Sequence, residues 1–394
     1  MQNFEFYLPT KIIFGKDAEL QVGLEIKNRN AKKVLVVYGS GSVKKSGLLD
    51  RVKSSLEQEG ISYVEWGGVQ PNPRLDHAQS GALFAISENV DFILAVGGGS
   101  VIDTAKAIAH GTANPNATIW DIWTKKVPLE KSLPVGAVLT ISAAGSETSD
   151  SAVLTNRQIG KKMGLSTPLN RPAFAIMNPE LTYTLPKYQI ACGIADIMMH
   201  TLERYFIPDQ SNQMTDEIAE GLLRTVIANG KTAVKDPHDY NAMSEIMWCG
   251  SISHNDMTGL GRKKDFSVHK LGHALGARFD CAHGASLTAV WGSWAEYVYR
   301  NDIDRFCHYG EKVWGLCTEN KEETARQAIA CTVNYFREIG MPVSLGELGI
   351  GIQEDSVLRE LALDATQNDS IVLSVIRKLK AEDVYRIFCM ANIG

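Results

Sequence analysis

Hydrophobic residues in the first half of the chain fall in short runs, separated by glycine-marked turns and by helix-like stretches. The runs are rich in β-branched and aliphatic residues and predict strands at 34–38, 63–66, 91–96, 133–140 and 173–177. Helix-like segments lie at 48–59 and 101–110. Strands that alternate with helices in this way are typical of a mostly parallel sheet covered on both faces.

The pattern changes near residue 185. Beyond it, apolar positions recur at i, i+3 and i+4, the period of an amphipathic helix, and the stretches concerned are 188–206, 214–234, 240–257, 283–300, 320–339 and 380–391. Asn178-Pro179 and Leu185-Pro186 interrupt any regular element between the two patterns. We therefore predict an α/β domain over residues 1–183 and an all-helical domain over residues 184–394, with the cleft between them as the default ligand site.

Composition and charge narrow the class of protein without indicating its chemistry. The 394 residues carry 40 Lys and Arg against 45 Asp and Glu, and 44% are hydrophobic, as in ordinary folded proteins. The net charge of −5 argues against a nucleic-acid binder, and no apolar stretch is long enough for a membrane span. The first residues lack the basic and apolar regions of a signal peptide, so we expect a cytoplasmic protein. Its seven cysteines contain no Cys-x-x-Cys pair, which favours free thiols in a reducing compartment.

A glycine run follows the predicted strand 91–96. Gly97, Gly98, Gly99 and Ser100 lie between this strand and a helix that we expect to begin at Val101. Small residues at such a place let main-chain N–H groups approach a phosphate, and the N-terminal end of a helix carries partial positive charge. A strand-to-helix turn that needs positive φ is the alternative explanation of the glycines. The position between a buried strand and a helix favours phosphate binding.

The turn Gly39-Ser40-Gly41-Ser42, after the first predicted strand, bears on which dinucleotide would bind. In dinucleotide-binding folds an acidic residue at such a place holds the ribose 2′-hydroxyl. No acidic residue is present in this turn, and Lys44 and Lys45 follow it. If the ligand is a nicotinamide dinucleotide, these residues favour NADP(H) over NAD(H). Lysines that are merely solvated are the alternative interpretation.

Histidines and one aspartate in the second half are spaced like metal ligands. Asp196 and His200 stand at i and i+4, on one face of a helix; His269 and His273 repeat the spacing, and His283 follows. Nine histidines in the chain predict about 0.3 in a 15-residue window, whereas the stretch from His269 to His283 holds three. Core or surface histidines are the alternative. One aspartate with two or three histidines suits Fe²⁺, Zn²⁺ or Mn²⁺, which would act as a Lewis acid on an alcohol or carbonyl oxygen.

Together these motifs resemble the iron-dependent, or group III, alcohol dehydrogenases over essentially the whole chain. The segments that carry the resemblance are Pro71-Asn72-Pro73, Gly97-Gly-Gly-Ser-Val-Ile-Asp103, Gly145-Ser-Glu147, Asp196-x3-His200, His269–Gly276 and Ala282-His-Gly284. Residues 4–15 and the turn at 39–47 are most similar to the branch of butanol dehydrogenases and broad-range aldehyde reductases. The resemblance implies a dehydroquinate synthase-like fold, with an α/β dinucleotide-binding domain followed by an all-α metal-binding domain.

The resemblance also implies roles for individual residues. It places one Fe²⁺ or Zn²⁺ on Asp196, His200, His269 and His283, and makes His273 a candidate catalytic proton relay. The expected cofactor contacts are Gly39, Ser40, Gly41, Ser42, Asn72, Gly97, Gly98, Gly99, Ser100, Asp103, Thr140, Ser142 and Lys162. Members of this branch commonly use NADP(H), which agrees with the turn after the first strand.

The activity that the resemblance implies is reversible hydride transfer between NADP(H) and a small aliphatic primary alcohol or aldehyde, in a homodimer. Ala144 stands where the family usually has threonine, and Ser149 where the branch often has asparagine, so the substrate range is open. An NAD-dependent polyol dehydrogenase of the glycerol type, or a metal-dependent synthase on this fold, is the alternative among enzymes. A nucleotide-binding regulator without turnover is the alternative of another class, and the intact ligand set argues against it. The residues that favour an apolar pocket, or simply form core, are Ile141, Met257, Phe266 and Leu271.

Overall fold

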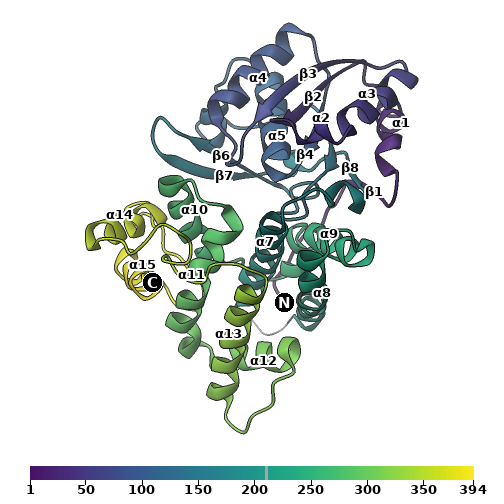
Figure 1. Ribbon diagram of the computed structural model, residues 1–394. Coiled ribbons are helices and arrows are strands. Elements are labelled where there is room, and N and C mark those ends of the chain that lie inside the picture. Colours follow the sequence, from purple (N-terminus) through teal and green to yellow (C-terminus); the bar gives the residue numbers. More distant parts are fainter. Residues whose placement is uncertain (209–211) are drawn as a thin grey trace. The chain divides into compact units, whose positions relative to one another are not determined.

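The chain forms two compact units in a computed structural model that describes residues 1–208 and 212–394. One unit is Tyr7–Thr184, and the other joins Met1–Phe6 to Leu185–Gly394 (Figure 1). The first is an α/β unit and the second is helical, so the predicted fold class is confirmed. Among the described residues, no helix has the length and apolar character needed to cross a membrane.

The α/β unit is built on a parallel sheet of six strands in the order β1-β8-β5-β4-β2-β3. These strands are β1 (Lys11–Phe14), β2 (Lys33–Gly39), β3 (Ser62–Val69), β4 (Phe92–Gly97), β5 (Val135–Leu139) and β8 (Phe174–Met177). All five predicted strands are present, within a few residues at their ends. An antiparallel hairpin of β6 (Ser151–Asn156) and β7 (Lys161–Ser166) was not predicted.

Helices cover both faces of this sheet (Figure 1). They are α1 (Val22–Lys27), α2 (Ser42–Lys45), α3 (Leu48–Gln58), α4 (Leu75–Ser87), α5 (Gly99–Ala113) and α6 (Ile119–Trp123). Successive side chains of a strand point to opposite faces. Leu94 and Val96 of β4 therefore share one fully buried core with α1 and α3, while Ile93 and Ala95 are buried on the face that α5 covers. Burial on both sides explains why β4 reads as an unbroken apolar run.

The helical unit consists of α7 and the helices that follow it along the chain. Its helices are α7 (Lys187–Tyr205), α8 (Gln213–Lys235), α9 (Tyr240–His254), α10 (Ser267–Phe279), α11 (His283–Val298), α12 (Ile303–Trp314), α13 (Lys321–Glu338), α14 (Asp355–Ala365) and α15 (Ala381–Ala391). Short 3₁₀ turns occur across the two units at Ala18–Gln21, Pro168–Asn170, Pro179–Thr182, Met257–Gly259 and Tyr299–Asn301. Helices α8, α9, α10 and α11 all contact α7. The N-terminal residues join this unit through the main-chain N–H of Gln2, which donates to the carbonyl of Gly261 at 2.8 Å.

Helix α7 is buried along nearly all of its length, from Ile190 to Tyr205. A helix in that position is expected to be apolar all round, because a buried charge costs several kcal/mol unless it is paired. Nevertheless α7 carries Asp196, His200 and Glu203, each no more than 4% exposed. Buried polar groups need partners, so this many on one helix indicates a functional site.

Candidate metal centre and cofactor site

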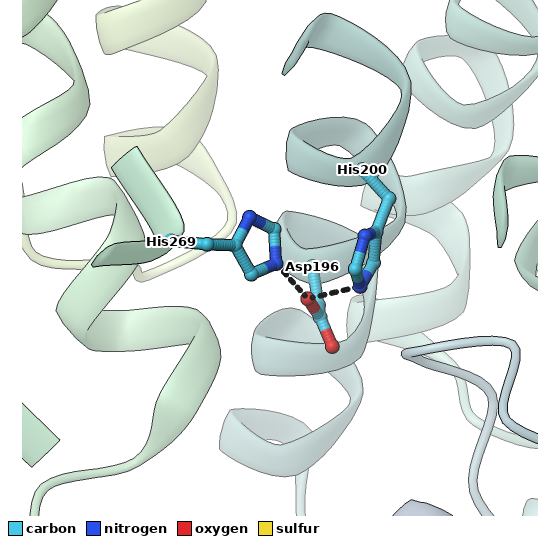
Figure 2. A group of neighbouring side chains, drawn as sticks. All are labelled: Asp196, His200 and His269. Atoms are coloured by element: carbon cyan, nitrogen blue, oxygen red, sulfur yellow. Dashed lines mark ion pairs between the residues drawn. The ribbon is translucent and has the colours of Figure 1, made fainter. Parts of the chain in front are cut away.

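Three imidazole rings of the helical unit converge on one carboxylate oxygen. Asp196 and His200 lie one turn apart on α7, and His269 faces them from α10 (Figure 2). The Nε2 atoms of His200 and His269 lie 3.4 and 3.6 Å from Oδ1 of Asp196. His283 is the first residue of α11, and its Nε2 lies 3.8 Å from the same oxygen. The structure thus places the imidazoles of three predicted ligands around the carboxylate of the fourth.

The spacing and burial of these atoms suit a small divalent metal ion. The ligand atoms of Asp196, His200 and His269 all lie within 4.8 Å of one another. Two ligands held tetrahedrally at the usual zinc–nitrogen or zinc–oxygen distances are about 3.4 Å apart. Nε2 of His269 is buried and makes no hydrogen bond within the described residues, although a polar atom in such a place normally has a partner. His283 lies on the open side of the site, since its side chain is 27% exposed.

A carboxylate that the sequence analysis did not identify lies behind His269. Glu203 is on α7, one turn beyond His200, and its side chain is 1% exposed. Its Oε1 accepts the main-chain N–H of His269 at 3.0 Å, and its Oε2 contacts Nδ1 of the same residue. The position of Glu203, seven residues after Asp196, places it on the same helix face, so helical periodicity was the available signal.

The imidazoles of His200 and His269 differ in their affinity for protons. Burial and the neighbouring His254 ring, which stacks on His200 with a centroid distance of 3.9 Å, lower the pKa of His200 well below its ordinary value. His200 is therefore neutral, which is the form that binds a metal. Burial also lowers the pKa of His269, but the charge of Glu203 and the contact with Asp196 outweigh it and raise this pKa to about 9.

This raised pKa predicts a pH dependence of metal binding. To bind through Nε2, His269 must lose a proton that it holds in the metal-free protein below about pH 9. Protons therefore compete with the metal, and the affinity for Zn²⁺ is expected to rise about tenfold per pH unit between neutrality and that pKa. Calorimetric titration of metal-free protein with Zn²⁺ in buffers of different ionisation enthalpy measures the protons released. Release of no proton at neutral pH would contradict this assignment.

His273 and Phe266 border the metal cluster without joining it. His273 lies one turn beyond His269 on α10, with its ring 5.4 Å from that of His283 and 6.1 Å from that of His269. Phe266 is half-buried and presents its ring edge-on to His200 and His269, at 6.5 and 5.7 Å. One side of the cluster is therefore apolar and another carries a further imidazole. Leu271, another candidate for an apolar pocket, is fully buried in the core.

In the α/β unit, the glycine run connects the end of β4 to the start of α5. A Cβ on Gly97 would lie 2.5 Å from Cγ2 of Val101, and one on Gly98 would lie 2.9 Å from Cδ1 of Ile141. None of the three glycines has positive φ, so the alternative explanation from backbone conformation is wrong. A Cβ on Gly99 would have only the Cβ of Ala144 near it, at 3.8 Å. Gly98 at the N-cap of α5 has no side chain to cap the helix, so the first N–H groups of α5 are available to a ligand.

Asp103 anchors α5 to the segment that leads into the hairpin. Its Oδ1 accepts the hydroxyl of Ser146 at 2.6 Å, and its Oδ2 accepts the main-chain N–H of Val153 at 2.9 Å. Lys106, one turn later and fully buried, donates to the carbonyls of Ser146 and Ser151 at 2.7 and 2.8 Å. Burial lowers the pKa of Lys106 to about 8. The sequence analysis predicted a role for Asp103 and did not identify Lys106.

The other predicted cofactor residues of this unit fall into two places. Thr140 follows β5 directly, and its main-chain N–H donates to the carbonyl of Gly97 at 3.2 Å. Ser142 is 5% exposed, and its hydroxyl makes no hydrogen bond within the described residues. Asn72 has a φ of 54°, and its side-chain oxygen accepts the ammonium of Lys162 at 3.0 Å. Thr140 thus lies beside the glycine run at Gly97, while Asn72 and Lys162 form a separate pair.

The turn that begins at Gly39 carries an exposed cation and has a carboxylate nearby. The ammonium of Lys44, in α2, lies 5.0 Å from the centre of the Tyr38 ring. The Tyr38 hydroxyl donates to Oε2 of Glu65 at 2.9 Å, and Oε1 of Glu65 pairs with Lys53 at 2.9 Å. Glu65 belongs to the neighbouring strand β3, so a search of the turn alone for an acidic residue could not identify it. Its carboxylate is already bound by two partners.

The chain is similar to known dehydrogenases along its whole length. Residues 9–179 match the family described as iron-containing alcohol dehydrogenase, and residues 190–391 match the C-terminal domain of the Fe-containing alcohol dehydrogenase family. The sequence is 39% identical to NADH-dependent butanol dehydrogenase A of Clostridium acetobutylicum, over 98% of this chain and 99% of that protein. It is 35% identical to the NADPH-dependent aldehyde reductase YqhD of Escherichia coli, over 96% and 99%. The crystal structure of NADH-dependent butanol dehydrogenase A from Thermotoga maritima superposes with a TM-score of 0.95 at 37% identity, covering 100% of this chain and 99% of that one.

Proposed function

The chain belongs to the iron-containing alcohol dehydrogenase family, and we propose that it transfers a hydride between NADP(H) and a small aliphatic primary alcohol or its aldehyde. The observation that carries this proposal is the convergence of three imidazole Nε2 atoms on Oδ1 of Asp196. Nitrogen and oxygen donors in this proportion suit Fe²⁺ or Zn²⁺ and not Mg²⁺ or Ca²⁺. The family and its named relatives make the chain an NAD(P)-dependent alcohol oxidoreductase.

In this proposal the helical unit binds the metal and handles the proton. A divalent ion on Asp196, His200, His269 and His283 would supply Lewis-acid stabilisation of negative charge on the substrate oxygen. Phe266 presents an apolar ring edge beside two of these residues, which suits an aliphatic chain. Alcohol oxidation removes a hydride from C1 and a proton from the hydroxyl. We assign that proton to His273, because its half-buried ring lies beside His283 at the open side of the cluster and an imidazole can accept and release a proton.

The α/β unit binds the dinucleotide, which supplies and accepts the hydride. The first N–H groups of α5, at Gly99 and Ser100, would hold the pyrophosphate. The buried hydroxyl of Ser142 would donate to the same ligand. Asp103 contributes by holding the neighbouring segment against α5. The residues proposed for the remaining contacts are Gly39, Ser40, Gly41, Ser42, Asn72, Gly97, Gly98, Thr140 and Lys162.

We further propose that NADP(H) is preferred over NAD(H). The turn from Gly39 to Ser42 contains no acid to hold a 2′-hydroxyl, and the exposed Lys44 follows it. Similar butanol dehydrogenases are named NADH-dependent and the similar aldehyde reductase is named NADPH-dependent, so both cofactors occur among these relatives. Butanal reduction, followed at the nicotinamide absorbance band, is expected to show a higher kcat/KM with NADPH than with NADH.

Lys44→Ala tests the residue that this preference depends on. If its ammonium pairs with the 2′-phosphate at the surface, the substitution is expected to lower kcat/KM for NADPH about fivefold and to leave that for NADH within about twofold. Lys126→Ala removes another surface lysine of the same unit, whose side chain is 70% exposed, and is expected to change neither value. A parent enzyme that prefers NADH would overturn the cofactor preference without affecting the proposed reaction.

We also propose that the enzyme is a cytoplasmic homodimer, as the family resemblance implies. Strand β1 lies at the edge of the sheet, and an edge strand can pair with a second chain. Apolar side chains that precede or belong to β1 are at least 40% exposed, namely Phe4, Phe6, Tyr7 and Phe14. Sedimentation equilibrium is expected to give twice the chain mass of 43.2 kDa.

A further inference from the structure

Glu203 directs both of its carboxylate oxygens to a single residue. Oε1 accepts the main-chain N–H of His269, and Oε2 contacts Nδ1 of the same histidine. The side chain of Glu203 is 1% exposed, so water does not compete for these contacts. The main-chain bond fixes the orientation of the carboxylate and thereby aims the second oxygen at the imidazole.

The contact with Nδ1 has a consequence for the other ring nitrogen. An ionised carboxylate is only an acceptor, so the group opposite it must be an N–H. A neutral imidazole that carries its proton on Nδ1 has its lone pair on Nε2, the atom that lies 3.6 Å from Asp196 Oδ1. Nε2 of His269 makes no hydrogen bond within the described residues, as expected of an atom kept for a metal.

His200 does not share this arrangement. Its Nδ1 lies 3.4 Å from a guanidinium nitrogen of Arg204, and that nitrogen donates to the main-chain carbonyl of His200 at 2.7 Å. Of these two histidines, His269 is therefore the one whose tautomer a carboxylate at Nδ1 can control.

We propose that Glu203 is a positioning residue that holds His269 in the Nδ1–H tautomer and presents its Nε2 lone pair to the metal. This inference rests on the metal centre of the proposed function. Outer carboxylates of this kind orient a histidine ligand and raise its basicity, and their loss typically weakens metal binding by about 10- to 100-fold.

Glu203→Gln tests this role with almost no change in shape. The amide oxygen can still accept the main-chain N–H of His269, which turns the amide NH₂ toward Nδ1. That group can only donate, so it favours the wrong tautomer, with the proton on Nε2. We expect the affinity of the metal-free protein for Zn²⁺, measured in competition with a chromophoric chelator, to fall about 10- to 100-fold.

Glu220→Gln is the matched control. Glu220 is also 1% exposed, on α8, and its carboxylate accepts the Tyr205 hydroxyl at 2.8 Å and pairs with His308 at 3.0 Å. The same change of charge in this place removes buried contacts without touching the ligands. Glu220→Gln is expected to bind Zn²⁺ as the parent does. Zn²⁺ binding by Glu203→Gln within about twofold of the parent would overturn the inference and leave the proposed function intact. A parent that binds neither Zn²⁺ nor Fe²⁺ would overturn both.

A measurement on the parent protein keeps the inference testable if Glu203→Gln does not fold. In Zn²⁺-loaded protein with ¹⁵N-labelled histidine, two-bond proton–nitrogen correlations report which ring nitrogen carries hydrogen. The ring that is lost in His269→Asn identifies His269. We expect it to show a protonated Nδ1 and a metal-bound Nε2. A protonated Nε2 would contradict the proposed role of Glu203.

Discussion

Replacing His269 with alanine is expected to remove the bound metal and to lower kcat/KM for alcohol oxidation by at least about a thousandfold. The substitution removes one of three convergent imidazoles, and the buried carboxylates of Asp196 and Glu203 both lose that partner. Loss of Lewis-acid stabilisation is worth several kcal/mol, and each 1.36 kcal/mol is about tenfold in rate. Metal content per chain after dialysis and steady-state kinetics measure the two effects on the same sample.

His238→Ala is the control for this prediction. His238 lies in the same unit, its side chain is 72% exposed, and its Nδ1 lies 3.9 Å from a carboxylate oxygen of Asp236. Its replacement is expected to leave the metal content and kcat/KM at the parent values. Full turnover by a metal-free His269→Ala protein would refute the metal-dependent scheme.

Gly99→Ala is expected to raise KM for NADPH at least about tenfold while leaving the protein folded. A Cβ at this position meets only Ala144 at 3.8 Å, so the fold has room for it. The same methyl group would stand at the first turn of α5, where the pyrophosphate is proposed to approach the main-chain N–H groups. Replacing a helical glycine by alanine otherwise stabilises a protein slightly. Cofactor KM and the thermal midpoint, Tm, are the two quantities to compare.

Gly221→Ala provides the matched substitution away from the cofactor. Gly221 lies within α8, and a Cβ there would have only the Arg224 guanidinium near it, at 3.9 Å. It is expected to keep the parent KM for NADPH with the same or a slightly higher Tm. An unchanged KM in Gly99→Ala would show that the phosphate does not lie against this turn.

The sheet and the cluster of side chains around Asp196 were predictable because each has a strong local signal. Strand β4 is buried on both faces and so reads as an unbroken apolar run. Asp196 and His200 repeat at helical spacing within a stretch of 3.6-residue period. The hairpin of β6 and β7 was missed because its strands are short and because β7 begins with two lysines and is mostly not buried. Its pairing depends on tertiary contacts such as the bond from Val153 to Asp103.

Residues that support the site were harder to find than those that form it. Glu203 sits on the same helix face as Asp196, but a glutamate on a helix is normally taken for a solvated residue. Only the burial of α7 shows that it must have a partner. Lys106 was missed for the same reason, since its burial and its carbonyl partners come from a distant segment. The roles of Gly97 and Gly98 also depended on the structure, because their neighbours Val101 and Ile141 require the space that a Cβ would fill.

Transfer of a hydride from the cofactor to an aldehyde at the proposed metal centre can be followed with an isotope. NADPH carrying deuterium at both C4 positions of the nicotinamide is incubated with butanal and either metal-loaded or chelator-treated protein, and the butanol is analysed by mass spectrometry. We expect deuterium on C1 of butanol with metal-loaded protein and almost no butanol after chelation, with turnover restored by Fe²⁺ or Zn²⁺. Equal turnover without metal would refute the role of the metal, and butanol without deuterium at C1 would refute hydride transfer from the cofactor.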